Sequence, residues 1–156
     1  MIAIDVPGRG AIQLHHLVLD VNGTLSTDGH LLEGVAESLQ GLKGQVNIHL
    51  LTADTYGRQG EIDRQLELTA VRLQPGAEAE QKGDYVRRLG ADHTAAIGQG
   101  ANDALMLKAA VLGIAVLGEE GTAVEALLNA DIVIPTIHQA LRLLAMPSRI
   151  KATLRR

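Results

Sequence analysis

Short apolar runs alternate with stretches of helical periodicity along the chain, and this alternation restricts the fold more than any other feature. The apolar runs lie at residues 17–19, 46–51, 71–73, 95–97, 114–117 and 132–134. The helical patterns lie between and after them, at residues 35–42, 57–66, 77–89, 102–110, 122–128 and 137–145. Because strands that alternate with helices pair in parallel, we predict an α/β domain with a doubly wound parallel sheet.

The length of the chain, 156 residues with 46% hydrophobic content, suits a single domain over residues 1–156. At the N-terminus, residues 1–14 hold two apolar triplets on either side of Pro7-Gly8-Arg9-Gly10, a turn sequence. We expect a small β-hairpin there, with a structural role as an edge extension of the sheet. Residues 146–156 concentrate Lys and Arg. We expect a solvated basic tail, for which binding to an anionic partner is the alternative.

Composition argues against several classes of partner. The chain has no Phe, no Trp and only two Tyr, so it lacks the aromatic platforms on which nucleobases stack. Its formal charge of -4 also argues against nucleic acid. No run approaches the ~20 apolar residues that span a bilayer, and residues 1–13 are too polar for a signal peptide. We expect no membrane partner and a cytoplasmic location, with which the absence of cysteine agrees.

Four predicted strand ends carry groups that suit phosphoryl transfer. Asp20 follows the run 17–19, and a carboxylate at the carboxyl end of a parallel strand can attack phosphorus to form an aspartyl phosphate. Thr52 and Ala53 end the next strand and offer a hydroxyl group and a backbone N–H group to phosphate oxygens. Lys82, near the start of a helix, supplies positive charge.

The fourth strand end is the glycine-rich turn 98–103, which places Asn102 and Asp103 at a helix N-terminus. A dinucleotide-binding fingerprint would need a third glycine where Asp103 stands, and this carboxylate would repel a pyrophosphate. Taken singly, Thr52 and the nearby Asp54 are more typical of helix caps. Phosphoryl transfer, however, needs a nucleophile, oxygen-binding donors and positive charge in one crevice, and the four strand ends together offer that set.

These motifs, in this order, resemble the haloacid dehalogenase (HAD) superfamily of aspartate-nucleophile phosphotransferases. More narrowly, residues 98–116 and 130–134 are similar, almost position by position, to the phosphorylation domain of P-type ATPases. The resemblance covers about residues 15–135. It implies that Asp20 is the nucleophile, that Thr52 and Ala53 bind the phosphoryl oxygens, and that Lys82 neutralises charge. It also implies a Mg²⁺ site, whose ligands would be Asp20, the carbonyl oxygen of Asn22, Gln99, Asn102 and Asp103.

Two positions depart from the family pattern. Asn22 stands where phosphatases of the superfamily carry a second aspartate for acid–base catalysis, which is commonly worth about 10²- to 10⁴-fold. Gln99 stands where a magnesium-binding carboxylate is usual, and a neutral amide is a poorer ligand for Mg²⁺. We therefore expect a Mg²⁺-dependent phosphohydrolase of low or narrow activity, with a weak metal site. Acyl phosphates and polyphosphates should suffer least, because their leaving groups need little protonation.

The spacing of the motifs also restricts the partners. Only 32 positions separate Asp20 from Thr52 and 30 separate Thr52 from Lys82, which leaves no room for an inserted cap domain. We expect an open site that acts on a phosphorylated small molecule or protein, with a homo-oligomer as one way to cover it. The competing hypothesis is a binding or regulatory protein on a degenerate phosphatase scaffold. A purely structural subunit is the weakest alternative.

Overall fold

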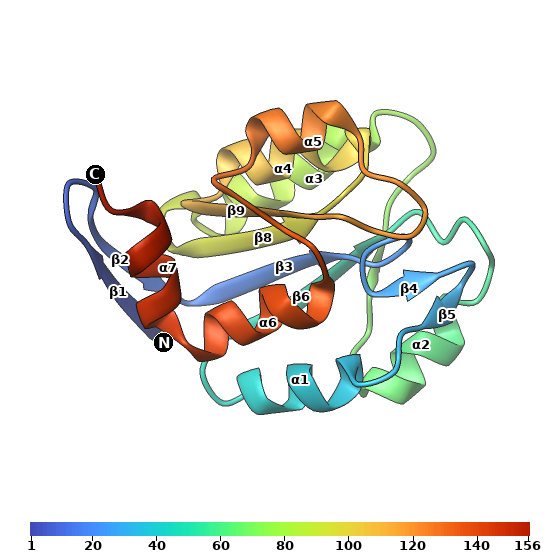
Figure 1. Cartoon of the computed structure of the whole chain (residues 1–156). Coiled ribbons are helices and arrows are strands. Elements are labelled where there is room, and N and C mark those ends of the chain that lie inside the picture. The colour runs from blue at the N-terminus through green and yellow to red at the C-terminus, as the bar shows by residue number, and fades with distance from the viewer.

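The computed structural model describes residues 1–156 and is built on a six-stranded sheet with helices on both faces (Figure 1). All neighbouring strands of this sheet are parallel. Their order is β10 (Ile132–Ile134), β9 (Leu112–Val116), β8 (Thr94–Gly98), β3 (His16–Asp20), β6 (Asn47–Thr52) and β7 (Val71–Arg72). The predicted α/β class and doubly wound parallel sheet are confirmed, and no cap domain is inserted.

The strand order places a crevice beside β3. From β3 the chain moves outward to β6 and β7, then returns to the other side of β3 and moves outward through β8, β9 and β10. Helices that follow strands on opposite sides of such a reversal point diverge, and ligands of doubly wound sheets bind there, outside the carboxyl ends of the strands. Asp20 is the last residue of β3 and therefore lies at this point.

Alternate residues of the strands divide the core into two clusters. Leu17 and Leu19 of β3 point into the larger cluster, while Val18 points into the smaller one. The larger cluster is completed by α1 (Val35–Leu42), α2 (Gln59–Leu66) and α6 (Ile137–Ala145). The smaller cluster is completed by α3 (Glu78–Leu89), α4 (Ala104–Ala109) and α5 (Val124–Asn129) on the opposite face (Figure 1). Because side chains alternate along a strand, Asp20 faces the same side as Val18, the side of α3 and α4.

The N-terminal hairpin is present, but it is not an edge extension. Strands β1 (Ile2–Val6) and β2 (Gly10–Leu14) pair only with each other and form a separate two-stranded sheet. They lie at the amino-terminal end of the main sheet, next to α7 (Pro147–Leu154) (Figure 1). The basic residues of the C-terminal segment are exposed, as expected, but the segment is a packed helix rather than a tail, because α7 packs on β1 and buries Ile150 completely. The sequence of this segment is mostly charged or polar, so its composition does not reveal the apolar contact of Ile150.

A second hairpin, β4 (Ser26–Thr27) and β5 (His30–Leu31), projects at the opposite end of the sheet, beyond Asp20 (Figure 1). Its turn residues Asp28 and Gly29 both have positive φ, 52° and 80°. That geometry fits the mirror-image turns of two-residue hairpins, for which Asp-Gly is a strong sequence signal. The sequence analysis does not predict this hairpin, because its strands have only two residues each, and Asp28-Gly29 is the one signal of it. No helix of the chain is long and apolar enough to cross a bilayer.

Candidate functional site

A buried lysine joins two buried carboxylates at the reversal point of the sheet. Lys82 Nζ donates to Asp20 Oδ1 at 2.7 Å and to Asp103 Oδ1 at 2.7 Å. The exposed fractions of Lys82, Asp20 and Asp103 are 1%, 4% and 0%. Such a cluster is held together by its charges, because removing one partner leaves an uncompensated buried charge that costs several kcal/mol. The structure thus brings together three of the residues predicted from the sequence.

Close packing of α3 on α4 brings Lys82 to this position. Gly83, the next residue of α3, lies so close to α4 that an added Cβ would come within 3.1 Å of the Leu105 side chain. On the sheet side, a Cβ on Gly113 would come within 2.4 Å of the carbonyl oxygen of Leu107. These glycines let α3 and α4 approach each other and the sheet. The ammonium group therefore reaches two different strand ends at once.

Burial raises the pKa of Asp20 to about 6, and the negative charge of Asp103 acts in the same direction. Lys82 and a hydrogen bond from Thr24 oppose that rise. Desolvation lowers the pKa of Lys82, but the two carboxylates outweigh it, so the pKa of Lys82 is raised above its ordinary value. Lys82 is therefore a permanent cation at neutral pH, whereas Asp20 changes its charge near pH 6.

Thr24 is a site residue that the sequence analysis missed. Its hydroxyl donates to Asp20 Oδ2 at 2.8 Å, and only 2% of the residue is exposed. Each oxygen of Asp20 thus receives one hydrogen bond, from Lys82 on Oδ1 and from Thr24 on Oδ2. The available signal was the stretch Asp-Val-Asn-Gly-Thr, in which Gly23 at φ 80° turns the chain back toward the strand end.

Thr52 presents a free hydroxyl hydrogen next to Asn22. Its Oγ1 accepts the backbone N–H of Asp54 at 2.8 Å and the Asn22 Nδ2 group at 3.3 Å. Since both contacts use its lone pairs, the hydroxyl hydrogen of this 1% exposed residue remains available for an anion. Asp54 acts as a cap, because its Oδ1 accepts the backbone N–H of Gln59 at the start of α2. Ala53, between them, is exposed.

The five predicted magnesium ligands make hydrogen bonds within the protein. Asp103 Oδ2 accepts the backbone N–H groups of Gln99 and Gly100, each at 2.9 Å, so both of its oxygens already have donors. Asn102 Nδ2 donates to Glu78 on α3. The carbonyl oxygen of Asn22 accepts Gln99 Nε2 at 3.3 Å. No group of three or more His, Cys, Asp or Glu side chains is arranged to hold a metal ion.

These donors do not fit a divalent cation. A hard cation such as Mg²⁺ needs several oxygen ligands, usually charged, pointing to one centre. Here an ammonium group and an amide N–H group are directed at the oxygens that would face the cation. The predicted magnesium site therefore stays a prediction, and the amide of Gln99 stands where the resemblance places a magnesium-binding carboxylate.

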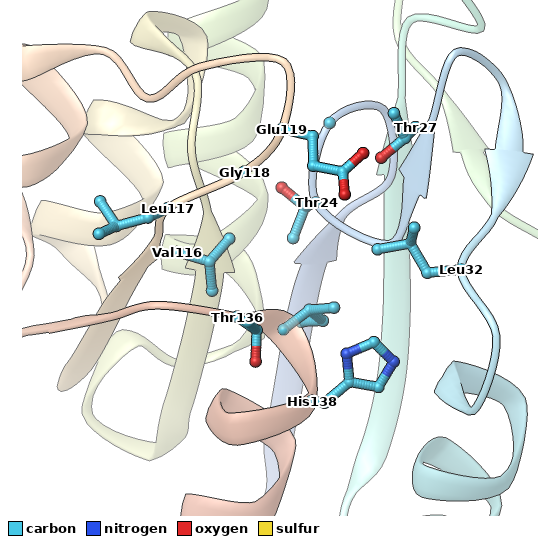
Figure 2. A pocket seen from close by; sticks show the side chains of 11 residues that line it. Thr24, Thr27, Leu32, Val116, Leu117, Gly118, Glu119, Thr136 and His138 are labelled. Carbon is cyan, nitrogen blue, oxygen red and sulfur yellow. The ribbon is translucent and has the colours of Figure 1, made fainter.

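A small cavity opens beside the Gly23-Thr24 turn, and Thr24 is one of its lining residues (Figure 2). Its volume is about 140 Å³. The hairpin β4–β5, the loop after β9 and the start of α6 form its walls, and Thr27, Leu32, Glu119 and His138 are among its lining residues. Asp20, Thr52 and Lys82 are not among them. The cavity is therefore a neighbour of the carboxylate cluster and not a part of it.

Hydrogen bonds of Glu120 connect three segments at the carboxyl end of the sheet. Glu120, in the loop after β9, accepts the backbone N–H of Asp28 at 3.2 Å through Oε2. Its Oε1 accepts the hydroxyl of Tyr56, in the loop after β6, at 2.6 Å. Glu120 thus connects the β4–β5 hairpin to the loop after β6 without a cap domain, and the open site stays a prediction.

Comparison with known sequences places the chain near two kinds of protein. No protein-family model matches it. The uncharacterized protein MJ0073 of Methanocaldococcus jannaschii is 52% identical over 60 residues, which cover 38% of this chain and 64% of that protein. The phospholipid-transporting ATPase tat-1 of Caenorhabditis elegans is 34% identical over 104 residues, which cover 66% of this chain and 9% of the ATPase. This chain spans less than two thirds of the length of either relative.

Solved structures share the fold more completely. A deoxy-D-mannose-octulosonate 8-phosphate phosphatase of Haemophilus influenzae, in a cobalt-bound form, has a TM-score of 0.70 at 16% identity, covering 86% of this chain and 88% of the phosphatase. The corresponding phosphatase of Moraxella catarrhalis, with magnesium and phosphate, has a TM-score of 0.67 at 17% identity, covering 91% and 94%. A zinc-transporting PIB-type ATPase has a TM-score of 0.58 at 28% identity, covering 79% of this chain and 20% of the pump.

Proposed function

We propose that this chain, which shares its fold with phosphatases of the haloacid dehalogenase superfamily, is a phosphohydrolase working through an aspartyl phosphate on Asp20. The observation that carries the proposal is the buried contact of Lys82 with both Asp20 and Asp103. A lysine so placed orients the nucleophile and neutralises charge that develops on a transferred phosphoryl group. The Asp20 carboxylate ends β3 at the reversal point, and each of its oxygens accepts one hydrogen bond that holds it in position.

The reaction has two steps. A carboxylate oxygen of Asp20 attacks phosphorus, the bond from phosphorus to the leaving oxygen breaks, and its electron pair stays with the leaving group. Water then attacks phosphorus in the aspartyl phosphate, which releases inorganic phosphate and restores the carboxylate. The Thr52 hydroxyl hydrogen is available to a phosphoryl oxygen in both steps, and Thr24 holds the carboxylate in position.

Asn22 limits the choice of substrate. Its Nδ2 group donates to Thr52 Oγ1 at 3.3 Å, so the amide helps to position the hydroxyl. An amide neither protonates a leaving group nor activates water, and the loss of that help costs about 10²- to 10⁴-fold. Donors with leaving groups of low basicity, such as acyl phosphates and polyphosphates, are therefore the proposed substrates. Turnover is expected to be slow because hydrolysis of the intermediate lacks a general base.

The family relatives hold Mg²⁺ or Co²⁺, and Mg²⁺ was our expectation for this chain. Because the donors do not fit such an ion, no step of the proposed reaction passes through one. Lys82 supplies the positive charge, and the hydroxyl and amide groups of Thr52 and Asn22 supply the neutral donors. A phosphorylated small molecule or protein remains the proposed partner class.

Phosphorylation with acetyl phosphate tests this function. The protein is incubated with acetyl phosphate, quenched in acid and digested, and the modified residue is identified by mass spectrometry. We expect a phosphoryl group on Asp20, lost on treatment with hydroxylamine, and absent from Asp20→Asn. The matched control is Asp92→Asn, an exposed carboxylate outside the site. Phosphate release that persists in Asp20→Asn would overturn the proposal.

The second candidate function is that of a binding protein for a phosphate-like anion. It is favoured by the hydrogen bonds that Asn22 and Gln99 make within the site, which satisfy polar groups without any reacting partner. Calorimetric titration with inorganic phosphate, combined with the phosphorylation experiment, distinguishes the phosphohydrolase from the binding protein. Saturable binding that Thr52→Val removes, combined with no phosphorylation of Asp20, would select the binding protein.

A further inference from the structure

A chain of neutral amides crosses the strand ends next to Asp20. Gln99, directly after β8, donates through Nε2 to the carbonyl oxygen of Asn22 at 3.3 Å. Asn22, in the turn after β3, donates through Nδ2 to Thr52 Oγ1 at the end of β6 at 3.3 Å. Two amides and one hydroxyl group thus connect three neighbouring strands at their carboxyl ends. A polar network with all its members paired can hold such loops in one arrangement.

The Gln99 side chain packs against Gly23, where no other side chain would fit. A Cβ on Gly23 would lie 2.0 Å from Gln99 Nε2, so the absence of a side chain at Gly23 makes room for the amide. The orientation of the amide also follows from its neighbour. With the amide turned over, its oxygen would face the carbonyl oxygen of Asn22, and two acceptors would repel each other. The nitrogen therefore has to face Asn22.

Asp103 cannot replace the missing carboxylate. Three N–H donors already point at its two oxygens, from Lys82 Nζ on Oδ1 and from the backbones of Gln99 and Gly100 on Oδ2. Of the two carboxylates that contact Lys82, Asp20 then remains, and it is paired with Lys82 and Thr24. One paired carboxylate and two neutral oxygens make a poor site for a divalent cation.

We propose that the amide of Gln99 takes the place of the divalent cation, so that this site takes a phosphate-like anion without any metal. The amide N–H group holds the Asn22 carbonyl oxygen in the position that a cation would otherwise hold. Lys82 and the Thr52 hydroxyl hydrogen supply the interactions with the anion. The inference rests on the proposed function for the identity of the anion, but its metal independence stands on the contacts of Gln99, Asp103 and Asp20.

Manganese titration tests the replacement directly. Binding of Mn²⁺, a paramagnetic substitute for Mg²⁺, is followed by electron paramagnetic resonance in the wild type, Gln99→Glu and Gln99→Asp. Gln99→Glu keeps the length of the side chain and exchanges the N–H donor for a carboxylate oxygen, while Gln99→Asp covers the case in which Glu reaches too far. The matched control is Gln65→Glu, on the exposed side of α2. Circular dichroism checks that every variant is folded.

We expect no saturable Mn²⁺ site in the wild type or Gln65→Glu. At least one Gln99 variant should bind one equivalent, tighter than the wild type by about 10-fold or more, and should lose it when Asp20→Asn is added. A single wild-type Mn²⁺ site that Asp20→Asn abolishes would overturn the inference. Folded Gln99 variants that both fail to gain a site would also overturn it, because the amide would then not be what excludes the cation.

Calorimetric titration with inorganic phosphate tests the anion. We expect the wild-type affinity to be the same, within about twofold, in EDTA and in excess Mg²⁺, and the binding of phosphate to the metal-binding Gln99 variant to strengthen with Mg²⁺. Wild-type binding that appears only with Mg²⁺ would overturn the inference. Absence of binding in both solutions would overturn the proposed function, while the manganese titration would still decide whether Gln99 replaces the metal.

Discussion

At the scale of single residues, Lys82 does the most to hold the site together. Its ammonium group contacts two carboxylates from different strand ends, and all three groups are buried. The cluster carries one positive and two negative charges when Asp20 is ionised. Any change at Lys82 therefore leaves two adjacent negative charges inside the protein, a more severe defect than the loss of one contact.

Replacing Lys82 by Met keeps most of the volume and removes the charge. We expect Lys82→Met to lower the free energy of unfolding by about 3–5 kcal/mol, because both carboxylates lose their buried partner. Urea unfolding followed by circular dichroism measures this loss. Lys108→Met, at an exposed position of α4, serves as the control and should stay within about 0.5 kcal/mol of the wild type. A similar small change in both variants would contradict the importance of the cluster.

The raised pKa of Asp20 predicts how the reaction depends on pH. Only the ionised carboxylate attacks phosphorus, so the initial rate of phosphorylation by acetyl phosphate should rise with pH through about 6 and then level off. In Thr24→Val the hydrogen bond that lowers this pKa is lost, and the midpoint should move to higher pH. A midpoint that stays in place in Thr24→Val would argue that another group controls the rate.

The same shift has an opposite consequence for stability. The pKa of Asp20 is higher in the folded protein, about 6, than its ordinary value of 3.8. Folding therefore favours the protonated carboxyl, and this contribution to stability is full below about pH 4 and is lost as pH rises through about 6. Ionisation of Asp20 at neutral pH, which makes the nucleophile available, therefore lowers the free energy of unfolding.

Restoring the family pattern at Asn22 and Gln99 gives a third prediction. The double variant Asn22→Asp, Gln99→Asp should raise phosphate release from phosphate monoesters in Mg²⁺ by about 10²-fold or more, since it returns an acid–base group and a carboxylate ligand. Steady-state phosphate release measures it, and Asn22→Asp alone in EDTA is the comparison. No gain in a folded double variant would count against a preserved active-site geometry.

At the scale of elements, α7 and the N-terminal hairpin support each other. A two-stranded sheet alone is marginal in water, and the apolar side of this one is covered by α7, with Ile150 fully buried. The backbone N–H of Arg156 also donates to the carbonyl oxygen of Pro7 at 3.0 Å. The basic residues of this segment therefore belong to the outer side of a packed helix.

Truncation of Ile150 tests the packing of α7. Ile150→Ala should lower the free energy of unfolding by about 2–5 kcal/mol, because it removes a buried side chain and leaves a cavity. Thr153→Ala, on the exposed side of the same helix, should have a small effect. Thermal or urea unfolding compares the two. Equal effects would show that α7 behaves as the solvated tail expected from its charge.

At the scale of the whole molecule, the two ends of the main sheet differ in the segments that cover them. The N-terminal hairpin and α7 lie at the amino-terminal end of the sheet, while the β4–β5 hairpin and the loops after β6 and β9 lie at the carboxyl end (Figure 1). Glu120 joins these three segments through Asp28 and Tyr56. The molecule has no cap domain, so these loops are the parts that can restrict access to the site.

The contacts of Glu120 predict how these loops behave. In Glu120→Ala the amide of Asp28 loses its acceptor, and its hydrogen exchange should accelerate by several-fold, about tenfold if the hairpin opens freely. Hydrogen exchange followed by NMR measures this change. Glu125→Ala, on exposed α5, is the control. Unchanged exchange at Asp28 would mean that the hairpin is held by its own strand contacts.

The sequence by itself determined the parallel sheet, the order of strands and helices, and the strand-end positions of Asp20 and Thr52, because the period of apolar residues reports which side of each element is buried. Their catalytic roles stay predictions. Only the tertiary structure decided that the charged C-terminal segment is a packed helix, that Thr24 holds Asp20, and that the amide of Gln99 faces Asn22. Those facts depend on which distant groups meet, and a local pattern records the burial of a residue but not the partner that satisfies it.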